Sequence, residues 1–192
     1  MRRMSKEVKN RILIWNIVLQ RAYEAMVADD RIWEMIVANP LADEYNCEYK
    51  VGNLRGNVNV LLSAHRALQT EAVILFCQIF TSGNAGPGIA ANRHDADVAS
   101  FRDDMESHVK TALGWGTAKY HSVFQSITTI RHKLTAHYDG KAAEYDEPMP
   151  GIVHRMKSPG VNFPQGQDRT DFISLIGASF EFVRDELIKS GS

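Results

Sequence analysis

The stretch TAKYHSVFQSITTIRHKLTAHYD, residues 117–139, decides the fold class of this chain. When it is wound as a helix at about 100° per residue, its apolar side chains gather on one face. That face comprises Tyr120, Val123, Phe124, Ile127, Ile130, Leu134 and Tyr138. An apolar stripe of this kind is typical of a helix that faces the core of a bundle. We therefore expect a long amphipathic helix that ends just before Gly140, a residue suited to the left-handed backbone at a helix C-terminus.

The same spacing of three and four residues between apolar positions recurs elsewhere along the chain. We expect a first helix that Ser5 caps, and a shorter second helix that Asp29 or Asp30 caps and that ends before Pro40. The remaining predicted helices comprise residues 54–80, either as one helix or as two broken near Gly56, 95–114 and 168–190. Between them, residues 41–53 are expected to form a polar link and residues 82–95 an irregular connection. No run alternates with a period of two for long enough to predict a long strand.

The length and composition of the chain suit a single all-α domain. Its 192 residues can bury a hydrophobic core, and 44% hydrophobic with 23% charged residues is a globular balance. We predict an antiparallel bundle of five or six helices that spans residues 1–192. A long irregular loop is expected at about residues 140–168, because its four prolines, Pro148, Pro150, Pro159 and Pro164, disfavour regular hydrogen bonding.

Charge and cysteine content restrict the partners of the chain. The formal net charge of -1 supplies no global basic field, so any nucleic-acid binding must be local. Cys47 and Cys77 are too few and too unpatterned for a disulfide framework or a zinc site, and no metal or other cofactor is expected. The N-terminal segment is interrupted by charges and shows no secretory signal or membrane span. We therefore expect a cytoplasmic protein with no membrane partner.

An arginine interrupts the apolar stripe of residues 117–139. Arg131 falls on that stripe between Ile127 and Leu134, and a guanidinium there must be paired or reach water. It could extend to the end of the bundle, pair with Asp139 or Glu71, or face a second subunit. His137 lies at the edge of the same stripe, in the last turn, where the negative end of the helix dipole favours a protonated imidazole. Such a histidine is either an acid/base group or a simple helix cap.

The segment RHKLTAH, residues 131–137, resembles the signature of the HEPN superfamily. In that signature an arginine is followed by a polar residue and, after a short spacer, by a histidine. His132 matches the polar second position, and KLTAHYDG, residues 133–140, is similar to abortive-infection-type HEPN proteins. The resemblance implies an all-α, HEPN-like bundle that is usually a homodimer. It also implies a metal-independent endoribonuclease in which motifs from two subunits meet in one cleft.

The resemblance gives each motif residue an expected role in RNA cleavage. The 2′-hydroxyl of the RNA would act as nucleophile, with His137 as the acid/base group. Arg131 would hold the phosphate with its fork of donors, and His132 would orient the reacting groups or share the proton transfer. The expected biological role is that of a toxin or phage-defence effector, with RNA as the substrate and an antitoxin protein as a partner.

Weaker candidates and rival hypotheses accompany this reading. Additional binding residues are Lys133, Tyr138 and Asp139 beside the motif and the basic pair His154 and Arg155 in the long loop. Lys133 is read most simply as a solvated surface residue, and histidines on apolar faces, such as His65, as hydrogen-bonded core residues. The main alternative is a non-catalytic HEPN-fold module that binds nucleotide, RNA or protein. The third hypothesis is an unrelated helical bundle with Arg131 in an ordinary ion pair.

Overall fold

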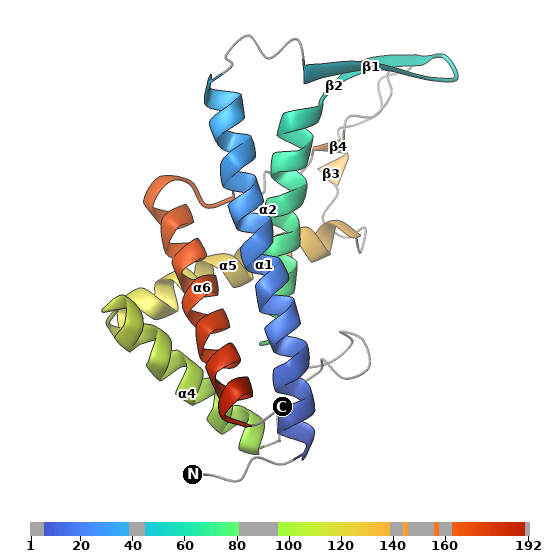
Figure 1. The fold of residues 1–192 in the computed structure, drawn as a ribbon. Coiled ribbons are helices and arrows are strands. Elements are labelled where there is room, and N and C mark those ends of the chain that lie inside the picture. The colour runs from blue at the N-terminus through green and yellow to red at the C-terminus, as the bar shows by residue number, and fades with distance from the viewer. Residues whose placement is uncertain are drawn as a thin grey trace.

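The computed structural model describes residues 6–38, 45–80, 96–138, 144–145, 156–157 and 163–190. Within these ranges it contains five helices and four strands (Figure 1). The helices are α1 (Lys6–Ala38), α2 (Val60–Gln78), α4 (Ala96–Leu113), α5 (Thr117–Tyr138) and α6 (Gly166–Lys189). The strands are β1 (Asn46–Val51), β2 (Leu54–Asn59), β3 (Glu144–Tyr145) and β4 (Met156–Lys157). The predicted all-α bundle of five or six helices is confirmed.

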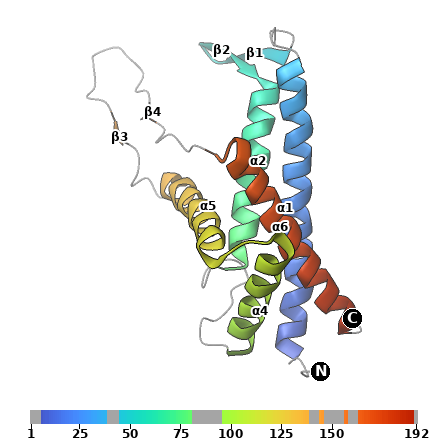
Figure 2. The ribbon, with the colours of Figure 1, turned by 90° about the vertical axis from the view of Figure 1, so that its left-hand side faces the viewer.

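The long helix α1 is the central element of the bundle. It packs along α2 on one side and along α6 on the other, and both neighbours run antiparallel to it (Figure 1). Helix α4 packs against α6, and α5 crosses α2 and contacts α6. Seen from the side, α4 and α5 lie together on one side of α1 and α2 (Figure 2). The C-terminal part of α5 therefore lies away from α1, next to α2.

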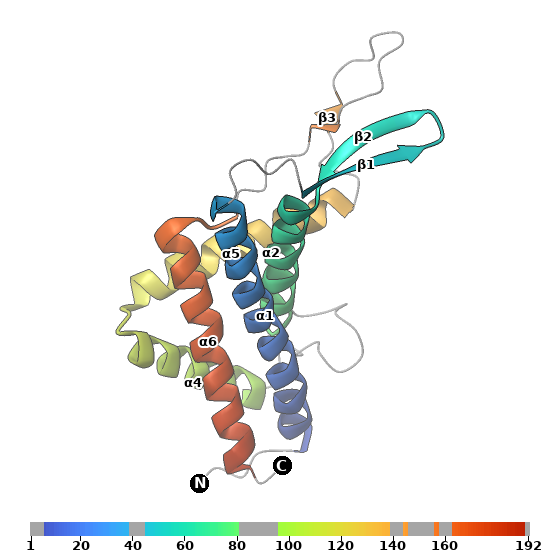
Figure 3. The same cartoon turned by 45° about the horizontal axis from the view of Figure 1, so that its top comes forward.

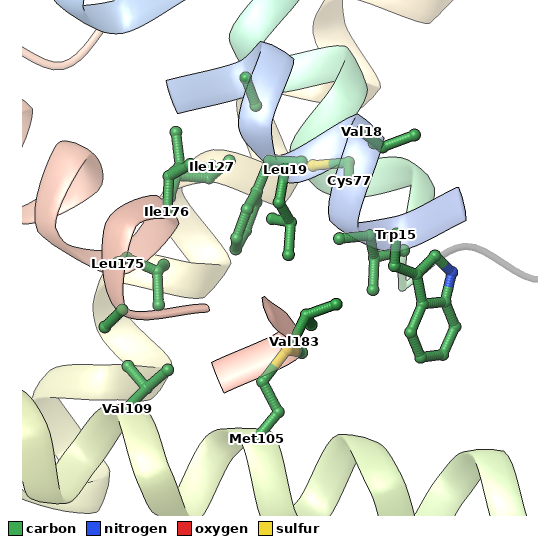
Figure 4. Close-up of a cluster of buried hydrophobic side chains, with 14 of the residues drawn as sticks. Trp15, Val18, Leu19, Cys77, Met105, Val109, Ile127, Leu175, Ile176 and Val183 are labelled. Atoms are coloured by element: carbon green, nitrogen blue, oxygen red, sulfur yellow. The ribbon is translucent and has the colours of Figure 1, made fainter. Parts of the chain in front are cut away.

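Apolar side chains from all five helices fill one continuous core (Figure 4). Its fully enclosed members include Trp15 and Leu19 of α1, Phe76 and Cys77 of α2, Met105 of α4, Ile127 of α5, and Leu175 and Ile176 of α6. Phe76 lies 5.8 Å from Phe172 and 6.3 Å from Phe124, measured between ring centroids. This one ring thus joins α2 to both α5 and α6.

The prediction of two helices between Ser5 and Pro40 is wrong, because α1 runs without a break from Lys6 to Ala38. The segment contains neither glycine nor proline, so nothing in it interrupts the helical hydrogen bonds. Asp29, which we expected to cap a second helix, instead directs its carboxylate into the protein interior and has no exposed surface. An acidic residue in a helix was therefore misread as a helix start.

The predicted link over residues 41–53 and the predicted helix over residues 54–59 are also wrong, because β1 and β2 form an antiparallel hairpin there. Its register runs from Asn46 opposite Asn59 to Val51 opposite Leu54. The two-residue loop contains Gly52 with a φ of 60°, which glycine adopts without strain. Helix α2 begins only after Asn59, whose side-chain oxygen accepts a hydrogen bond from the backbone N–H of Leu62 at 3.0 Å. The hairpin extends beyond the helices at one end of the bundle (Figure 3).

The expected irregular connections fall mostly outside the described residues. Residues 82–95 lie outside them entirely. Within the loop predicted at about residues 140–168, β3 and β4 form a small antiparallel pair with Glu144 opposite Lys157. Helix α6 begins at Gly166, two residues before its predicted start.

Helix α2 is the one helix among the described residues that is long and apolar enough to cross a membrane. This measure rests on length and composition alone, and core helices of soluble proteins also satisfy it. The buried side of α2, which includes Ala72, Val73, Phe76 and Cys77, faces the core of the bundle.

Truncation of Phe76 tests the assignment of this ring as the junction between three helices. We expect Phe76→Ala to lower the free energy of unfolding by about 3–5 kcal/mol, because it leaves a cavity among the rings of α2, α5 and α6. The matched control is Leu13→Ala, since Leu13 is 49% exposed on α1, and it should cost less than about 1 kcal/mol. Urea denaturation followed by circular dichroism measures both. Equal effects of the two substitutions would contradict the assignment.

Candidate functional site

Helix α5 carries the motif residues, and the structure places them at different depths. Its face toward the core holds Tyr120, Val123, Ile127 and Ile130, all buried. Arg131 is half-buried at the edge of this face, as its place on the predicted apolar stripe required. His132 is exposed.

The guanidinium of Arg131 lies close enough to α2 to influence a core cysteine. Burial raises the pKa of the Cys77 thiol to about 12, and the positive charge of Arg131 opposes this rise. Cys77 therefore remains a neutral core residue at physiological pH, as its apolar setting in the sequence suggested.

The other predicted site residues lie partly or wholly outside the described part of the structure. The last turn of α5 contains His137 and Tyr138, but their side chains are not among the described groups. Asp139, His154 and Arg155 lie outside the described residues altogether.

A polar groove of about 950 Å³ runs beside α5 and passes the start of the motif. Its α5 wall carries imidazole, hydroxyl, amide and ammonium groups, from His121, Ser122, Gln125, Ser126, Thr129 and Lys133. Its opposite wall is the segment that enters α6, with Phe163, Pro164, Gln165 and Asp168. Lys133 is exposed, as expected for a surface residue, but it also lines this groove. A groove with this lining can donate several hydrogen bonds to a ligand, and it carries one cation, Lys133, and one carboxylate, Asp168.

The first turns of α6 are tied to α5 by a buried carboxylate. Asp171 is 5% exposed and accepts hydrogen bonds from Lys119 of α5 and from Gln167, the latter at 2.9 Å. The hydrogen bond from Lys119 lowers the pKa of Asp171, and that from Gln167 adds to the effect. This contact holds the two walls of the groove together at the N-terminal end of α5.

A second buried carboxylate ties the start of α6 to α1 and α2. Asp29 lies 2.6 Å from the guanidinium of Arg169 and 2.5 Å from Nδ1 of His65. The amide of Gln69 donates to Asp29 at 3.3 Å, and Arg169 also lies 2.6 Å from Asp30. Nδ1 of His65 and the Asp29 oxygen that it contacts make no hydrogen bond with each other or with any other group that the structure describes. His65 was expected to be a hydrogen-bonded core residue; it is partly buried and contacts this carboxylate, but its Nδ1 makes no hydrogen bond to a described residue.

Sequence reasoning missed this cluster because its members are far apart in the chain. Arg169 and Asp29 are 140 residues apart, and no local pattern relates them. The available signal was an aspartate on the apolar side of a helix, on the same face as Ala22 and Met26. The geometry supports a structural role, since a buried charge is tolerated only when cations and donors surround it.

Among the described residues, no group of three histidine, cysteine, aspartate or glutamate side chains is arranged to hold a metal ion. Comparisons with protein-family models, curated proteins and solved structures gave no match to this chain. The interpretation of the site therefore rests on its residues and their geometry.

The contacts of Asp29 with Arg169, His65 and Gln69 predict that two adjacent carboxylates, Asp29 and Asp30, contribute very differently to the free energy of unfolding. We expect Asp29→Asn to lower the free energy of unfolding by about 3 kcal/mol, because the guanidinium of Arg169 loses the buried carboxylate that compensates its charge. The control is Asp30→Asn, which also removes a contact with Arg169 but from a side chain that is 47% exposed. Its cost should stay below about 1 kcal/mol. Chemical denaturation of both variants measures the difference, and equal costs would contradict the structural role of Asp29.

The contact between Lys119 and Asp171 predicts a pH-dependent contribution to stability. Because the pKa of Asp171 is lowered in the folded state, the contact stabilises the protein above the unfolded-state pKa of about 4. That contribution is lost as the pH falls through the lower folded-state pKa. At pH 7 we expect Asp171→Asn to lower the free energy of unfolding by about 1 kcal/mol, since Lys119 is partly exposed.

Urea denaturation at a series of pH values tests this behaviour. The difference in the free energy of unfolding between wild type and Asp171→Asn should become smaller below about pH 4. Asp104→Asn, on the exposed face of α4, serves as the control and should show no comparable narrowing. A difference for Asp171→Asn that is constant from pH 7 to pH 3 would contradict the assignment.

Proposed function

We propose that the protein is a metal-independent endoribonuclease of the HEPN type that acts as a toxin or phage-defence effector. One observation supports this proposal above the others. Helix α5 carries the half-buried Arg131 and the exposed His132 beside a polar groove that Lys133 lines, and the last turn of the same helix carries His137. The RNA backbone would enter this groove at Lys133, because Lys133 lines it whereas Arg131 and His132 do not.

The proposed reaction uses the RNA itself as the source of the nucleophile. His137 removes the proton from a 2′-hydroxyl, the 2′-oxygen attacks the adjacent phosphorus, and the bond from phosphorus to the 5′-oxygen breaks. A protonated histidine returns a proton to the departing 5′-oxygen, and a 2′,3′-cyclic phosphate remains. Arg131 stabilises the charge on the phosphorane oxygens. His132 orients these groups or shares the proton transfer.

A second copy of the chain is expected to complete this site. Arg131 and His137 are six positions apart, which places them about 120° apart around one straight helix. They therefore do not point to a single phosphate from one α5. Two copies related by a twofold axis near α5 would place an arginine from one helix and a histidine from the other on the same phosphate. The homodimer, the RNA substrate and the antitoxin partner belong to this proposal, as does the cytoplasmic location.

Substitution of His137 tests the proposal directly. His137→Ala should reduce the rate of cleavage of single-stranded RNA by about 10²–10⁴-fold, the usual contribution of general acid/base catalysis. The assay contains a chelator, and mass spectrometry of the fragments should find 2′,3′-cyclic phosphate ends. Circular dichroism verifies that the fold is retained. Equal cleavage by wild type and His137→Ala would show that the activity is not that of this site.

Arg131→Lys is assayed in the same experiment. It distinguishes the role of the positive charge of Arg131 from the role of its planar set of hydrogen-bond donors. It retains the positive charge but loses the planar fork of donors, so we expect a loss of cleavage with the fold retained. The control is Arg184→Lys, at a guanidinium that is 51% exposed on α6, and it should cleave like wild type. Wild-type protein that binds RNA without cleaving it would favour the non-catalytic binding module. Protein that neither binds nor cleaves RNA would favour the unrelated bundle.

A further inference from the structure

The β1–β2 hairpin is a two-stranded sheet that projects from the end of the α1–α2 pair (Figures 1 and 3). Within the described part of the chain, β1 pairs only with β2. A two-stranded hairpin is marginally stable by itself, and the outer edge of a strand presents a row of backbone donors and acceptors. These two properties make β1 a candidate for pairing with a further strand.

The register of the hairpin separates a polar face from an apolar one. Directly opposite residues lie on the same face. The polar face carries Glu48 and Lys50 of β1 opposite Asn57 and Arg55 of β2. The other face carries Cys47 and Tyr49 opposite Val58 and Gly56. Tyr49 and Val58 remain 46% and 40% exposed on this apolar face.

The polar face contains an unfavourable pairing of charges. Lys50 lies directly opposite Arg55, and like charges in this position destabilise a sheet. Glu48 lies opposite the neutral Asn57, two positions away from Lys50 on the same strand. A carboxylate placed beside Lys50 on the outer side of β1 would offset the charge of the two cations.

We propose that β1 of a second copy of this chain supplies that carboxylate by pairing antiparallel with β1. A twofold axis at Tyr49 places Tyr49 opposite Tyr49 of the second copy. Glu48 then lies opposite Lys50 of the second copy, and Lys50 opposite its Glu48. The two hairpins become one four-stranded antiparallel sheet with two identical cross-strand ion pairs. The two Tyr49 residues form the central cross-strand pair, while each ring lies over Gly56 of its own hairpin.

Other self-pairings of the hairpin lack this complementarity. A shift of the twofold axis by one residue places either the two Glu48 side chains or the two Lys50 side chains opposite each other. The outer edge of β2 carries Arg55 as its one charged residue, so pairing of β2 with itself gathers cations without a carboxylate. Only the axis at Tyr49 lets both charged residues of β1 meet opposite charges.

This interface is independent of the proposed ribonuclease activity. It uses the hairpin, whereas the association expected from the HEPN resemblance uses α5. A contact of one strand pair is small, so the dimer is weak and requires measurement up to high micromolar concentration. A chain that used both twofold contacts would form a tetramer rather than a dimer.

Reversal of the charge at Lys50 distinguishes an effect on the proposed dimer from an effect on the stability of the single hairpin. Lys50→Glu creates an attractive pair with Arg55 within the hairpin but places Glu48 opposite a glutamate in the second copy. The hairpin is therefore favoured while the dimer is disfavoured. We expect the dissociation constant from sedimentation equilibrium to rise by about tenfold or more. The double variant Glu48→Lys with Lys50→Glu restores the complementarity and should restore the wild-type constant.

The matched control and a cross-link complete the test. Arg55→Glu makes the same change of charge on β2 and should not weaken the dimer. In a Cys47→Ser background, Tyr49→Cys should form an intermolecular disulfide on mild oxidation, because opposite Cα atoms in antiparallel strands are about 4.5–5.5 Å apart. Asn57→Cys on β2 should not form one. Three outcomes would overturn the proposal. One is a Lys50→Glu variant that self-associates with the same dissociation constant as wild type. The others are a double variant that does not restore that constant, and equal cross-linking at positions 49 and 57.

Discussion

The fully buried carboxylate of Asp29 imposes the constraint on which the arrangement of the bundle depends. A fully buried charge within α1 is tolerated only where cations and hydrogen-bond donors contact it. His65 and Gln69 of α2 and Arg169 of α6 meet this requirement. They approach from two different helices, so the carboxylate fixes both neighbours of α1 against it. The apolar core contributes most of the driving force for folding, while this cluster specifies how the three helices meet.

The position of the groove beside α5 follows from that arrangement. Arg169 and Asp171 lie in the first turns of α6, and they reach α1 and α5 respectively. Both contacts follow directly after the segment that enters α6, and that segment forms the wall of the groove opposite Ser122, Ser126 and Thr129. The buried charges far from the motif thus shape the surface next to it.

Much of the fold could be predicted from the sequence, because α4, α5 and α6 each carry a sustained helical period. The predicted bounds of α5, residues 117–139, differ by one residue from Thr117–Tyr138. The hairpin was missed because its strands are short and its alternating pattern is divided by the loop at Gly52 and Asn53. The continuity of α1 was missed because Asp29 has the residue type of a helix cap. Its actual role depends on Arg169, 140 residues away, and no local pattern contains that information.

The candidate site was predictable in part, for a related reason. The stripe of residues 117–139 correctly indicated that Arg131 lies at a buried face and that His132 and Lys133 project outward. The groove itself could not be predicted, because one of its walls comes from residues 163–168 and depends on the tertiary contacts of α6. The polar residues on the α5 wall have no distinctive spacing of their own. They become a site only when α6 is placed opposite them.

We propose that the RNA backbone lies in the groove between α5 and the start of α6. This proposal is tested most directly by nuclear magnetic resonance with a short single-stranded RNA whose 2′-hydroxyls are methylated, so that it binds but provides no nucleophile. We expect the amide resonances that shift on titration to cluster in residues 121–133 and 163–168, and the shifts to diminish as salt is raised. Shifts confined to another surface, or no shifts at millimolar RNA, would show that the groove does not bind the RNA backbone.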